Sequence, residues 1–599
     1  MNNIFNVGNT WKKLPQSYHS PRRWRSTSVS TENGPSYLLH PGSAPLVEQT
    51  IGQLLDQTVN RFPNRNCLVS LHQNVCLTFS EARKRADKLA AGLKKLGLNK
   101  GDRLGVWGPN TIEWYLAYMA SARGGFKLIG INPADQTTEL EYGLNKVGVR
   151  AVIAPDTFKT QNYPEMLLNA KARCPTLEHI VIASDKTDVK IVKFIKLAKR
   201  CIESLDNKKK KSGTRRFVDV ESLPSAVEVE AIGAEQSEIS PKSGAIIQFT
   251  SGTTGRPKAA EVSHMSFVNN SRQVSLLLKN RMVELHHDQT RICPNVPFFH
   301  AFGLVMTILA PLHAGTTVVL SGPSFNPRES IDAIVKEKCN VMYGTPTMWV
   351  DMINAQQEIN APIGKMVNGV TGGSPASPDL FRRSIYGQTE STAICFETLP
   401  DTPRELTETT VGHLSDHTEA QVVDENGIPV PFGTPGELWV RGYHTMIGYW
   451  EDEVNNKKTI TDDGWLKSGD QFILRSDGYG KVIGRLKDML IRGGENIFPK
   501  EIEDFLETHP AIIEAHVFGV HDDRLGEDIC ACIRLRKGFE LTADDIKAYG
   551  KGKVAHFKIP RYVHVTQDFP KTASGKVQKH LLREALEVRG TVPTRPKFN

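Results

Sequence analysis

A loop rich in small and hydroxyl-bearing residues follows an apolar segment near the middle of the chain. The apolar segment runs from Gly244 to Phe249, and the loop ends at a lysine. Small residues let backbone N–H groups approach phosphate oxygens, hydroxyl groups add donors, and a lysine supplies counter-charge. The residues that we expect to bind phosphate are Thr250, Ser251, Gly252, Thr253, Thr254, Gly255, Arg256, Pro257 and Lys258.

This loop does not have the Walker A pattern. That pattern needs a lysine and then a hydroxyl residue directly after the last glycine, whereas Gly255 is followed by Arg-Pro-Lys. We therefore expect the nucleotide to be held in a different way. A flexible linker has a similar composition, but the apolar strand before the loop and the lysine at its end favour phosphate binding.

Further sequence blocks occur in a fixed order and carry a family resemblance. Together with the loop they resemble the acyl-adenylate-forming superfamily, which includes acyl-CoA synthetases, peptide-synthetase adenylation domains and firefly-type luciferases. The resemblance extends from about residue 50 to the end, and residues 491–499 and 526–535 are similar to mitochondrial medium-chain acyl-CoA synthetases. The other blocks are Pro297–His300, Gly372–Pro375, Tyr386–Glu390, Gly436–Gly442, Gly464–Asp470, Gly484–Asp488 and Pro570–Lys576.

The resemblance implies a two-step ligase reaction. A fatty acid attacks ATP to give acyl-AMP and pyrophosphate, and the acyl group then passes to coenzyme A. Because a carboxylic acid with a pKa of ~4 is already ionised near neutral pH, the first step needs charge neutralisation rather than a general base. ATP, Mg²⁺ and coenzyme A are therefore the expected cofactor and co-substrates.

The resemblance also implies roles for residues on the nucleotide side. Thr389 and Glu390 correspond to the phosphate and metal contacts, and a carboxylate is a suitable ligand for Mg²⁺. Considered alone, this pair would more often be a helix terminus, and isolated acids and arginines would more often be surface charges. The further ATP-binding residues that the resemblance implies are Gly373, Tyr386, Asp470 and Arg485.

Other implied roles concern the acyl group and the second step. Lys576 corresponds to the catalytic lysine of adenylation, which would stabilise charge that develops at the α-phosphate. Lys487 corresponds to a hinge, and Gly493 and Gly494 to a loop that faces coenzyme A. His300 corresponds to a position beside the acyl pocket, and a buried histidine without a gating role is an equally good interpretation.

One spacing departs from the family pattern. Only the twelve residues 374–385 separate Gly373 from Tyr386, whereas the resemblance implies a segment about twice as long or longer that forms a helix and a sheet strand. A strand of the central sheet is therefore expected to be missing, either because the sequence is incomplete or because the fold has compensated. The alternative function is a catalytically impaired or inactive relative.

The elements that must position these residues alternate between helix and strand. Apolar residues from Ala82 to Leu93 share one face of a helix that begins at Ser80. A strand from Asp102, a helix from Thr111 and a strand from residue 126 to residue 131 follow. We expect an α/β fold with parallel strands, in which a large N-terminal domain of several subdomains covers residues 41–486.

A small mobile α+β domain is expected over residues 487–599. Residues 500–509 show helical spacing, residues 511–520 and 528–535 have strand character, and Thr542 begins another helix with a capping-box pattern. No carrier domain follows Lys576, which favours a stand-alone CoA ligase over a peptide-synthetase module or a luciferase-like oxygenase.

The N-terminal segment, residues 1–40, has the composition of a mitochondrial transit peptide. Five basic residues precede the first acidic one, Glu32, among Ser, Thr and Asn. A disordered basic tail is the alternative. We expect a location in the mitochondrial matrix.

The whole-chain composition is ordinary for a globular protein. With 39% hydrophobic and 23% charged residues and a net charge of +8 among 599 residues, it does not indicate nucleic-acid binding. The nine cysteines form no C-x-x-C pair, which predicts free thiols in a reducing compartment. Residues 186–216 are lysine-rich and predict a solvated insertion rather than a membrane contact; we expect no transmembrane helix, and the oligomeric state is open.

Overall fold

The fold was analysed in a computed structural model. It describes residues 34–42, 44–184, 213–250, 257–284, 289–364, 366, 368–372, 384–493, 495–551, 553–572 and 577–593.

One eight-stranded sheet forms part of the large body within these described residues. Six strands are parallel, and two strands at one edge are antiparallel. The parallel arrangement predicted from the alternating helices and strands is therefore confirmed, with an antiparallel edge added. In spatial order the strands are β10 (Gly213–Arg216), β9 (His179–Ala183), β6 (Ala151–Pro155), β4 (Arg103–Trp107), β5 (Lys127–Ile131), β11 (Gly244–Thr250), β12 (Lys258–Ser263) and β22 (Gly448–Tyr449).

A second sheet has six strands in the described part of the chain. Five of them are parallel, and β3 pairs with β2 in an antiparallel hairpin. In spatial order they are β16 (Asn368–Thr371), β15 (Val341–Gly344), β13 (Arg291–Pro294), β14 (Thr317–Leu320), β2 (Asn66–Ser70) and β3 (Val75–Thr78).

Alternating side chains show that the two sheets sandwich a shared helical layer. On β4, Leu104 and Val106 join the large core that also contains Val318 of β14, whereas Trp107 packs in a separate cluster with α4 and α5. Successive side chains of a strand face opposite sides of its sheet, so each sheet buries both faces. The helices of the large body are α1 (Ile51–Arg61), α2 (Phe79–Lys95), α3 (Ile112–Gly124), α4 (Thr137–Val147), α5 (Tyr163–Lys171), α7 (Phe217–Glu221), α8 (Ala226–Ala234), α9 (His264–Glu284), α10 (Ala301–Gly303), α11 (Ala310–Ala314), α12 (Pro327–Lys336), α13 (Pro346–Ile359), α14 (Arg404–Thr409) and α15 (Glu453–Thr459).

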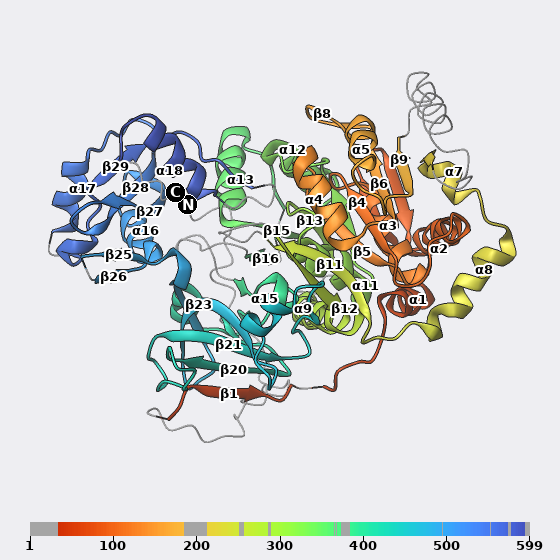
Figure 1. The fold of residues 1–599 in the computed structure, drawn as a ribbon, viewed down its shortest axis with the longest axis horizontal. Helices are drawn as coiled ribbons and strands as arrows, with labels where there is room; N and C mark the ends of the chain where they lie inside the picture. The colour runs from red at the N-terminus through yellow and green to blue at the C-terminus, as the bar shows by residue number, and fades with distance from the viewer. Residues whose placement is uncertain are drawn as a thin grey trace.

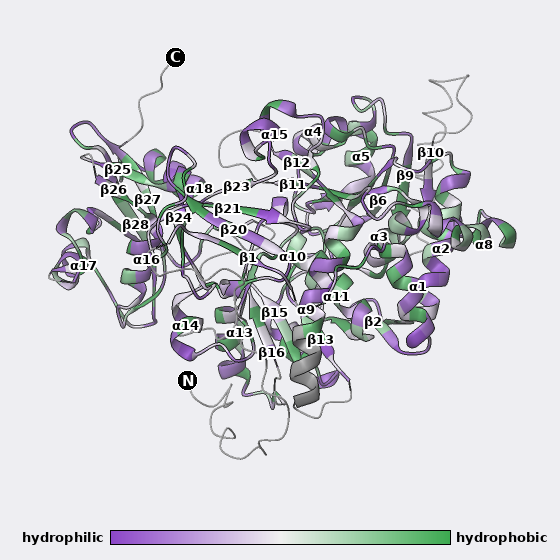
Figure 2. Ribbon diagram, turned by 90° about the horizontal axis from the view of Figure 1, so that it is seen from below, coloured by the Kyte–Doolittle hydropathy of each residue, from purple (hydrophilic) through white to green (hydrophobic). Residues whose placement is uncertain are grey.

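Short helical turns and a small hairpin complete the large body. The 3₁₀ turns are η1 (Glu235–Glu238), η3 (Thr389–Ser391) and η4 (Leu486–Asp488), and η2 (Leu304–Leu309) is a π-helical segment between α10 and α11. The hairpin consists of β7 (Thr157–Phe158) and β8 (Gln161–Asn162). Figure 2 shows the expected contrast between the hydrophobic interior strand β15 and the hydrophilic surface helix α14.

Helix α2 illustrates why the sequence pattern was reliable. Thr78 and Glu81 form a capping box that satisfies the first free N–H groups of the helix. Ala82, Ala86 and Leu89 are fully buried, and the helix ends two residues before Gly97. The predicted helices from Ser80 and Thr111 are confirmed, each within one residue of its predicted start.

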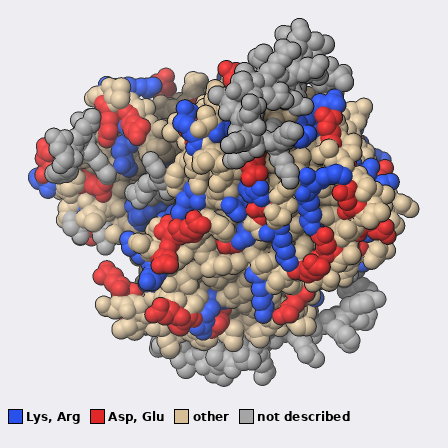
Figure 3. Space-filling view, turned by 45° about the vertical axis from the view of Figure 1, so that its right-hand side comes forward, with Lys and Arg blue, Asp and Glu red and all other residues tan. Residues whose placement is uncertain are grey.

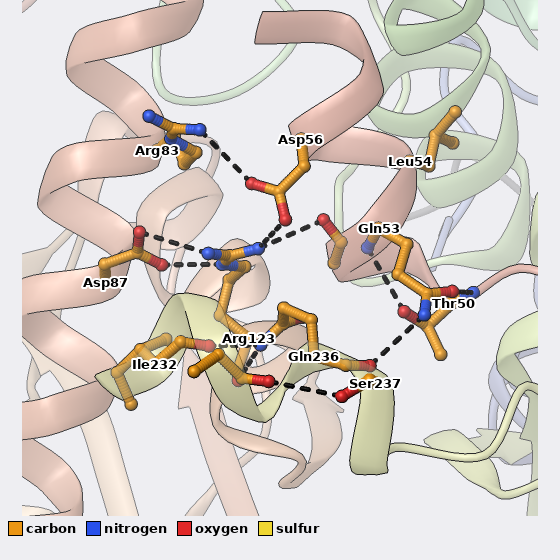
Figure 4. A network of polar contacts seen from close by, with 12 residues as sticks. Thr50, Gln53, Leu54, Asp56, Arg83, Asp87, Arg123, Ile232, Gln236 and Ser237 are labelled. Carbon is orange, nitrogen blue, oxygen red and sulfur yellow. Dashed lines mark hydrogen bonds and ion pairs between the residues drawn. The ribbon is translucent and has the colours of Figure 1, made fainter. Parts of the chain in front are cut away.

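A buried arginine joins the helices behind the first sheet (Figure 4). Arg123 of α3 is 2% exposed; its Nε lies 2.6 Å from Asp87 Oδ1 on α2 and its Nη1 lies 2.5 Å from Asp56 Oδ2 on α1. The backbone oxygen of Arg123 accepts a 2.8 Å hydrogen bond from the side chain of Gln236 on η1. Four helical elements therefore share one polar centre.

Two smaller sheets lie next to the large body. A five-stranded antiparallel sheet contains β1 (Tyr37–His40), β20 (Thr418–Val423), β21 (Gly436–Gly442), β23 (Leu466–Leu474) and β24 (Gly480–Arg485). A three-stranded sheet contains β17 (Ile385–Tyr386), β18 (Phe396–Glu397) and β19 (His413–Leu414). Strand β1 lies inside the segment 1–40 that the sequence set apart, so the paired sheet already begins at Tyr37.

A smaller unit follows η4 and lies on the left of Figure 1. Its sheet contains β26 (Glu495–Ile497), β25 (Leu490–Arg492), β28 (Gly526–Leu535), β27 (Ile512–Asp522) and β29 (Tyr562–Val565). Its helices are α16 (Pro499–Glu507), α17 (Ala543–Gly550) and α18 (Lys579–Val588), with the 3₁₀ turn η5 (His556–Lys558). The strands and helices predicted after residue 500 are confirmed, including the Thr542 capping box.

Surface and membrane features add little to the fold. Acidic and basic side chains are mixed on the face that Figure 3 shows. In the described ranges, no helix is both long and apolar enough to cross a bilayer. The eight described cysteines are all free thiols. The predicted lysine-rich insertion falls mainly in residues 185–212, outside the described residues.

Candidate active site

The candidate site lies where parallel strands of both sheets end. Strand β11 ends at Thr250, and β12 returns from Lys258, with these two residues paired across the hairpin. Ligands in open α/β sheets bind outside the carboxyl ends of the strands. The predicted phosphate loop therefore leaves the sheet at a suitable edge, and the hydroxyl of Tyr142 donates a hydrogen bond of 2.9 Å to the carbonyl of Pro257.

A tight turn presents the Tyr386–Glu390 block. Thr392 and Ala393 after it have φ of +57° and +95°, which is unusual for residues other than glycine. A Cβ at Gly387 would lie 2.2 Å from the carbonyl oxygen of Ala393, so only glycine fits there. The motif glycine therefore lets the turn fold back on itself.

The carboxylate of Asp470 is the centre of one half of the site. Asp470 is 3% exposed on β23. Its Oδ2 accepts hydrogen bonds of 2.6 Å from the hydroxyl of Tyr386 and 2.7 Å from Nε2 of Gln388. Its Oδ1 lies 3.0 Å from Nε of Arg485, an ion pair without hydrogen-bond geometry. Oδ1 can therefore still accept a hydrogen bond from a bound hydroxyl.

A second carboxylate lies beside the end of the phosphate loop. Oε1 of Glu390 accepts a 2.8 Å hydrogen bond from the hydroxyl of Tyr449 on β22. Nζ of Lys258 lies 4.8 Å from the centre of the Tyr449 ring. Tyr449 thus contacts both Lys258 and Glu390. The Tyr386–Glu390 turn also brings Glu390 close to Asp470, so three charged residues that are far apart in sequence lie in one region.

The charges in this region influence one another. Burial raises the pKa of Tyr386, and the Asp470 carboxylate raises it further, so the phenol stays a proton donor. Burial alone would lower the pKa of Arg485, but Asp470 and nearby acids outweigh it and the pKa is raised. Burial lowers the pKa of Lys487, and the neighbouring Arg485 adds to this effect.

His300 has a local structural role. It caps α10, with Nδ1 accepting a hydrogen bond of 3.3 Å from the backbone N–H of Phe302. The preceding residue, Phe299, lies against Gly130 at the end of β5, and its carbonyl accepts a 3.2 Å hydrogen bond from Gln248 of β11. The capping contact accounts for a histidine at this position, and a gating role stays a prediction.

The predicted hinge and the small unit directly follow the end of β24 that carries Arg485. Lys487 occupies η4, between the last strand of the five-stranded sheet and β25. Gly493 has φ of +60°, and its N–H donates a 2.8 Å hydrogen bond to the carbonyl of Leu525. The neighbouring Arg492 is held 2.7 Å from the buried Asp528. The described part of the predicted CoA-side loop is thus anchored to the small unit at Arg492 and Gly493.

The small unit also approaches α13. Burial raises the pKa of Asp351 on that helix, and Lys571 and Arg534 of the small unit oppose the rise. Lys571 pairs with Val577 in an isolated bridge, which brackets the segment that carries Lys576. Lys571, at the start of that segment, therefore lies on the side of the small unit that faces the large body.

Several predicted residues fall outside the described ranges. Thr250, Pro257, Lys258, His300, Tyr386, Thr389, Glu390, Asp470, Arg485, Lys487 and Gly493 are described. The residues outside the described part are Ser251, Gly252, Thr253, Thr254, Gly255, Arg256, Gly373, Gly494 and Lys576.

Two residues of this region were missed in the sequence. Gln388 stands inside the Tyr386–Glu390 block, but nothing in the sequence indicated its contact with Asp470, which lies 82 residues away. Tyr449 lies in a Gly-Tyr-Trp run that begins after a gap of five residues from the Gly436–Gly442 block. The aromatic pair beside a glycine was the available signal.

The edge of the second sheet comes shortly before the Tyr386–Glu390 block in the sequence. In the described residues the last parallel strand of this sheet is β16, and one parallel bridge joins Thr371 to Ser384. A Cβ at Gly372 would lie 2.7 Å from the side chain of Ile385, so the two chain segments are in close contact. Tyr386 still reaches Asp470 despite the short connection.

A separate cavity of about 280 Å³ lies away from these residues. It opens at the carboxyl ends of β4, β6 and β9 beside the start of α3, and its wall includes Trp107, Trp114 and Asp156. None of the predicted site residues lines it, so it is distinct from the site described above.

Comparisons with known proteins agree with the order of the large body and the small unit along the chain. The AMP-binding enzyme family matches residues 55–450, and the AMP-binding enzyme C-terminal domain matches residues 501–576. The chain is 41% identical over 567 residues to mouse "Medium-chain acyl-CoA ligase ACSF2, mitochondrial", covering 92% of this chain and 90% of that protein. It is 34% identical to the putative acyl-CoA synthetase YngI of Bacillus subtilis, covering 90% and 98%.

Solved structures share the fold. ATP-bound MatB from Rhodopseudomonas palustris aligns with a TM-score of 0.73 at 23% identity, covering 90% of this chain and 99% of that chain. A Mycobacterium tuberculosis fatty acyl CoA synthetase aligns with a TM-score of 0.61 at 21% identity over the same shares. The predicted fold, a large domain followed by a small α+β unit, is confirmed.

Proposed function

We propose, because this chain belongs to the AMP-binding enzyme family, that it is an ATP-dependent ligase that joins a fatty acid to coenzyme A. The observation that carries this proposal is the convergence of three separated motifs. Tyr386 and Gln388 reach Asp470, while Glu390 of the same turn is linked through Tyr449 to Lys258 at the end of the phosphate loop. Such a site offers polar contacts for a nucleoside and cations for its phosphates.

The first step makes an acyl-phosphate bond. A carboxylate oxygen of the fatty acid attacks the α-phosphorus of ATP, the bond from that phosphorus to the bridging oxygen breaks, and pyrophosphate leaves. We assign to Lys258 and Arg485 the reduction of repulsion between the two anions. We assign to Asp470, whose buried Oδ1 accepts no hydrogen bond from the described residues, a ribose hydroxyl. We assign to Lys576 the stabilisation of the reacting phosphate.

The second step transfers the acyl group to sulfur. The thiolate of coenzyme A attacks the acyl carbonyl, the bond to the AMP oxygen breaks, and AMP leaves; the thiol proton goes to solvent. We propose that the small unit turns about Lys487 between the steps, which would bring the Gly493–Gly494 loop toward the acyl-adenylate. Glycines at this loop would allow its backbone to approach the substrate closely.

The residues around Glu390 suit a magnesium ion. In the described residues no group of three or more acidic, histidine or cysteine side chains could hold a metal. Mg²⁺ does not need one, because it usually keeps water ligands and binds through one or two carboxylates and the phosphates of the substrate. Glu390 uses Oε1 for the Tyr449 hydroxyl, and we assign its other oxygen to the ion, which would neutralise phosphate charge when bound.

The substrate class and location come from the relatives. Relatives from mouse and human, each 41% identical, are named mitochondrial medium-chain acyl-CoA ligases. We therefore propose medium-chain fatty acids as substrates, and the mitochondrial matrix as the location, with residues before β1 acting as the transit peptide. The acid-poor composition before Glu32 supports this location.

The test is a panel of unbranched fatty acids of four to eighteen carbons with ATP, Mg²⁺ and coenzyme A. We expect acid-dependent release of pyrophosphate and AMP in equal amounts, and an acyl-CoA detectable by mass spectrometry, with the highest kcat/KM for acids of medium length. Pyrophosphate release without thioester formation would instead indicate a different acyl acceptor. No acid-dependent AMP formation would support the inactive alternative, which neither the site geometry nor the comparisons favour.

A further inference from the structure

Tyr449 contacts both charged groups at the phosphate end of the candidate site. Its hydroxyl donates to Oε1 of Glu390 at 2.8 Å, and its ring carries the ammonium group of Lys258 at 4.8 Å from the ring centre. Tyr449 itself is 6% exposed. One buried side chain therefore touches the carboxylate assigned to the metal and the lysine assigned to the phosphates.

Sheet register explains why Tyr449 meets Lys258. Strand β22 pairs antiparallel with β12, and Tyr449 lies opposite Ala260. Lys258 is two residues from Ala260 on the same strand, so both side chains face the same side of the sheet as Tyr449. A diagonal pair of this kind lies within reach of an aromatic and a long side chain. The register of β22 on β12 thus brings the ammonium group of Lys258 to the ring of Tyr449.

The backbone of Tyr449 is held from the opposite side. Oδ1 of Asn456 on α15 accepts a 2.6 Å hydrogen bond from the N–H of Tyr449, and Nδ2 of Asn456 donates a 3.0 Å hydrogen bond to its carbonyl. A Cβ at Gly448 would lie 3.1 Å from that amide group, so a glycine there leaves Asn456 room. Both backbone groups of Tyr449 are therefore occupied, which restricts where its ring can lie.

A second contact holds the Glu390 turn to the same segment. The N–H of Met446 donates a 2.9 Å hydrogen bond to the carbonyl of Glu390. Burial raises the pKa of Tyr449, and the Glu390 carboxylate raises it further, so the hydroxyl remains a donor at physiological pH. The turn is thus anchored through both its backbone and its carboxylate.

We propose that Tyr449 is a positioning residue for the nucleotide reaction, which orients Glu390 through its hydroxyl and Lys258 through its ring. This inference rests on the proposed function, in which Glu390 binds Mg²⁺ and Lys258 binds phosphate. Groups that orient a metal ligand commonly affect metal affinity by about 10–100-fold. The hydroxyl and the ring have separable roles, because one serves the metal and the other serves the phosphate loop.

The experiment measures ATP binding by calorimetry, with Mg²⁺ and with EDTA, in the full chain. Tyr449→Phe keeps the ring, and we expect it to reduce the gain in affinity that Mg²⁺ provides by about tenfold while metal-free ATP binding stays unchanged. Tyr449→Leu removes the ring as well, and metal-free binding should then weaken by about two- to fivefold. Equal losses with and without Mg²⁺ in Tyr449→Phe would overturn the proposal.

A matched control comes from a similar contact elsewhere. The hydroxyl of Tyr37 on β1 donates to Oε2 of Glu419 at 2.8 Å, so Tyr37→Phe loses the same type of hydrogen bond. That variant should keep the wild-type response to Mg²⁺. If it lost the response to the same degree as Tyr449→Phe, the effect would be non-specific and the proposal would be overturned.

A double-mutant cycle tests this inference separately from the proposed function. Its result can be interpreted even when a variant changes the overall stability of the protein. If Tyr449 acts through Glu390, Tyr449→Phe should have no further effect on the Mg²⁺ response in a Glu390→Gln background. A full Mg²⁺ response in Glu390→Gln alone would overturn the metal assignment of Glu390, on which the inference rests. A response lost in Glu390→Gln but intact in Tyr449→Phe would overturn the Tyr449 inference alone.

Discussion

Replacing Gln388 by leucine tests whether the site depends on a fixed Asp470 carboxylate. Nε2 of Gln388 donates to Oδ2 of Asp470 at 2.7 Å and to the carbonyl of Ser468 at 2.8 Å. Leucine has a similar size but no donor. The variant therefore removes one of the two hydrogen bonds to Oδ2 and leaves the other, from Tyr386, in place.

The expected loss follows from these contacts. A hydrogen bond to a charged group contributes about 1.5–3 kcal/mol, which corresponds to about 10–150-fold in an equilibrium or rate constant. Because Tyr386 still holds the same oxygen, we expect the lower end, a decrease of about tenfold in kcat/KM for ATP. The KM for the fatty acid should stay within about twofold, since Asp470 is assigned to the nucleotide.

The assay is continuous detection of pyrophosphate with ATP varied at saturating fatty acid and coenzyme A. Gln356→Leu is the control, because Gln356 also donates one hydrogen bond to a carbonyl, that of Ala361 at the end of α13. Gln388→Glu adds a diagnostic pH profile: two adjacent carboxylates repel, so its defect should be smaller at pH 6 than at pH 8. A wild-type kcat/KM for ATP in Gln388→Leu, or a Gln388→Glu defect independent of pH, would refute the reasoning.

Two further predictions concern stability. Arg123→Met should destabilise the large body by about 3 kcal/mol, the lower end of the range for a broken buried ion pair, because it leaves the half-buried Asp87 without its hydrogen-bonded cation. In urea unfolding, the exposed pair Arg475–Asp477 serves as control, and an equal loss in Arg475→Met would contradict the difference in burial. Burial raises the pKa of Glu507 to about 7, so the wild type loses stability as pH rises from about 4.3, the unfolded value, through 7. Glu507→Gln should therefore slow hydrogen exchange of β27 relative to wild type at pH 8 but not near pH 4. The advantage at pH 8 should be about 3–4 kcal/mol, because the two pKa values differ by about 2.7 and each unit corresponds to about 1.4 kcal/mol; the same advantage at both pH values would disprove the assignment.

The local pattern of the sequence was enough for most elements. The capping box of Thr78 and Glu81 and the apolar spacing from Ala82 predicted α2, and the Thr542 capping box predicted α17. These signals act between residues three or four apart, so they can be seen without the fold. The same holds for the strand before Thr250, in which only Gln248 interrupts the apolar residues from Ala245 to Phe249.

The edge of the second sheet was less predictable. The short connection before Tyr386 indicated a missing strand, but not that a single bridge between Thr371 and Ser384 and the contact of Gly372 with Ile385 would join the two segments. Such contacts depend on packing between segments whose spacing the sequence does not state. The chain spacing alone therefore did not show that Tyr386 still reaches Asp470.

The sequence by itself determined the chemistry: a Gly/Ser/Thr loop ending in Lys258, an acid at Glu390 and another at Asp470, together with the family to which these blocks point. Only the tertiary structure decided which neutral side chains hold those charges in place. Gln388 meets Asp470 across 82 residues, and Tyr449 meets Glu390 across 59. The physical reason is that a hydrogen bond depends on distance and direction in space, and β22 acquires its position beside β12 only when the sheet forms.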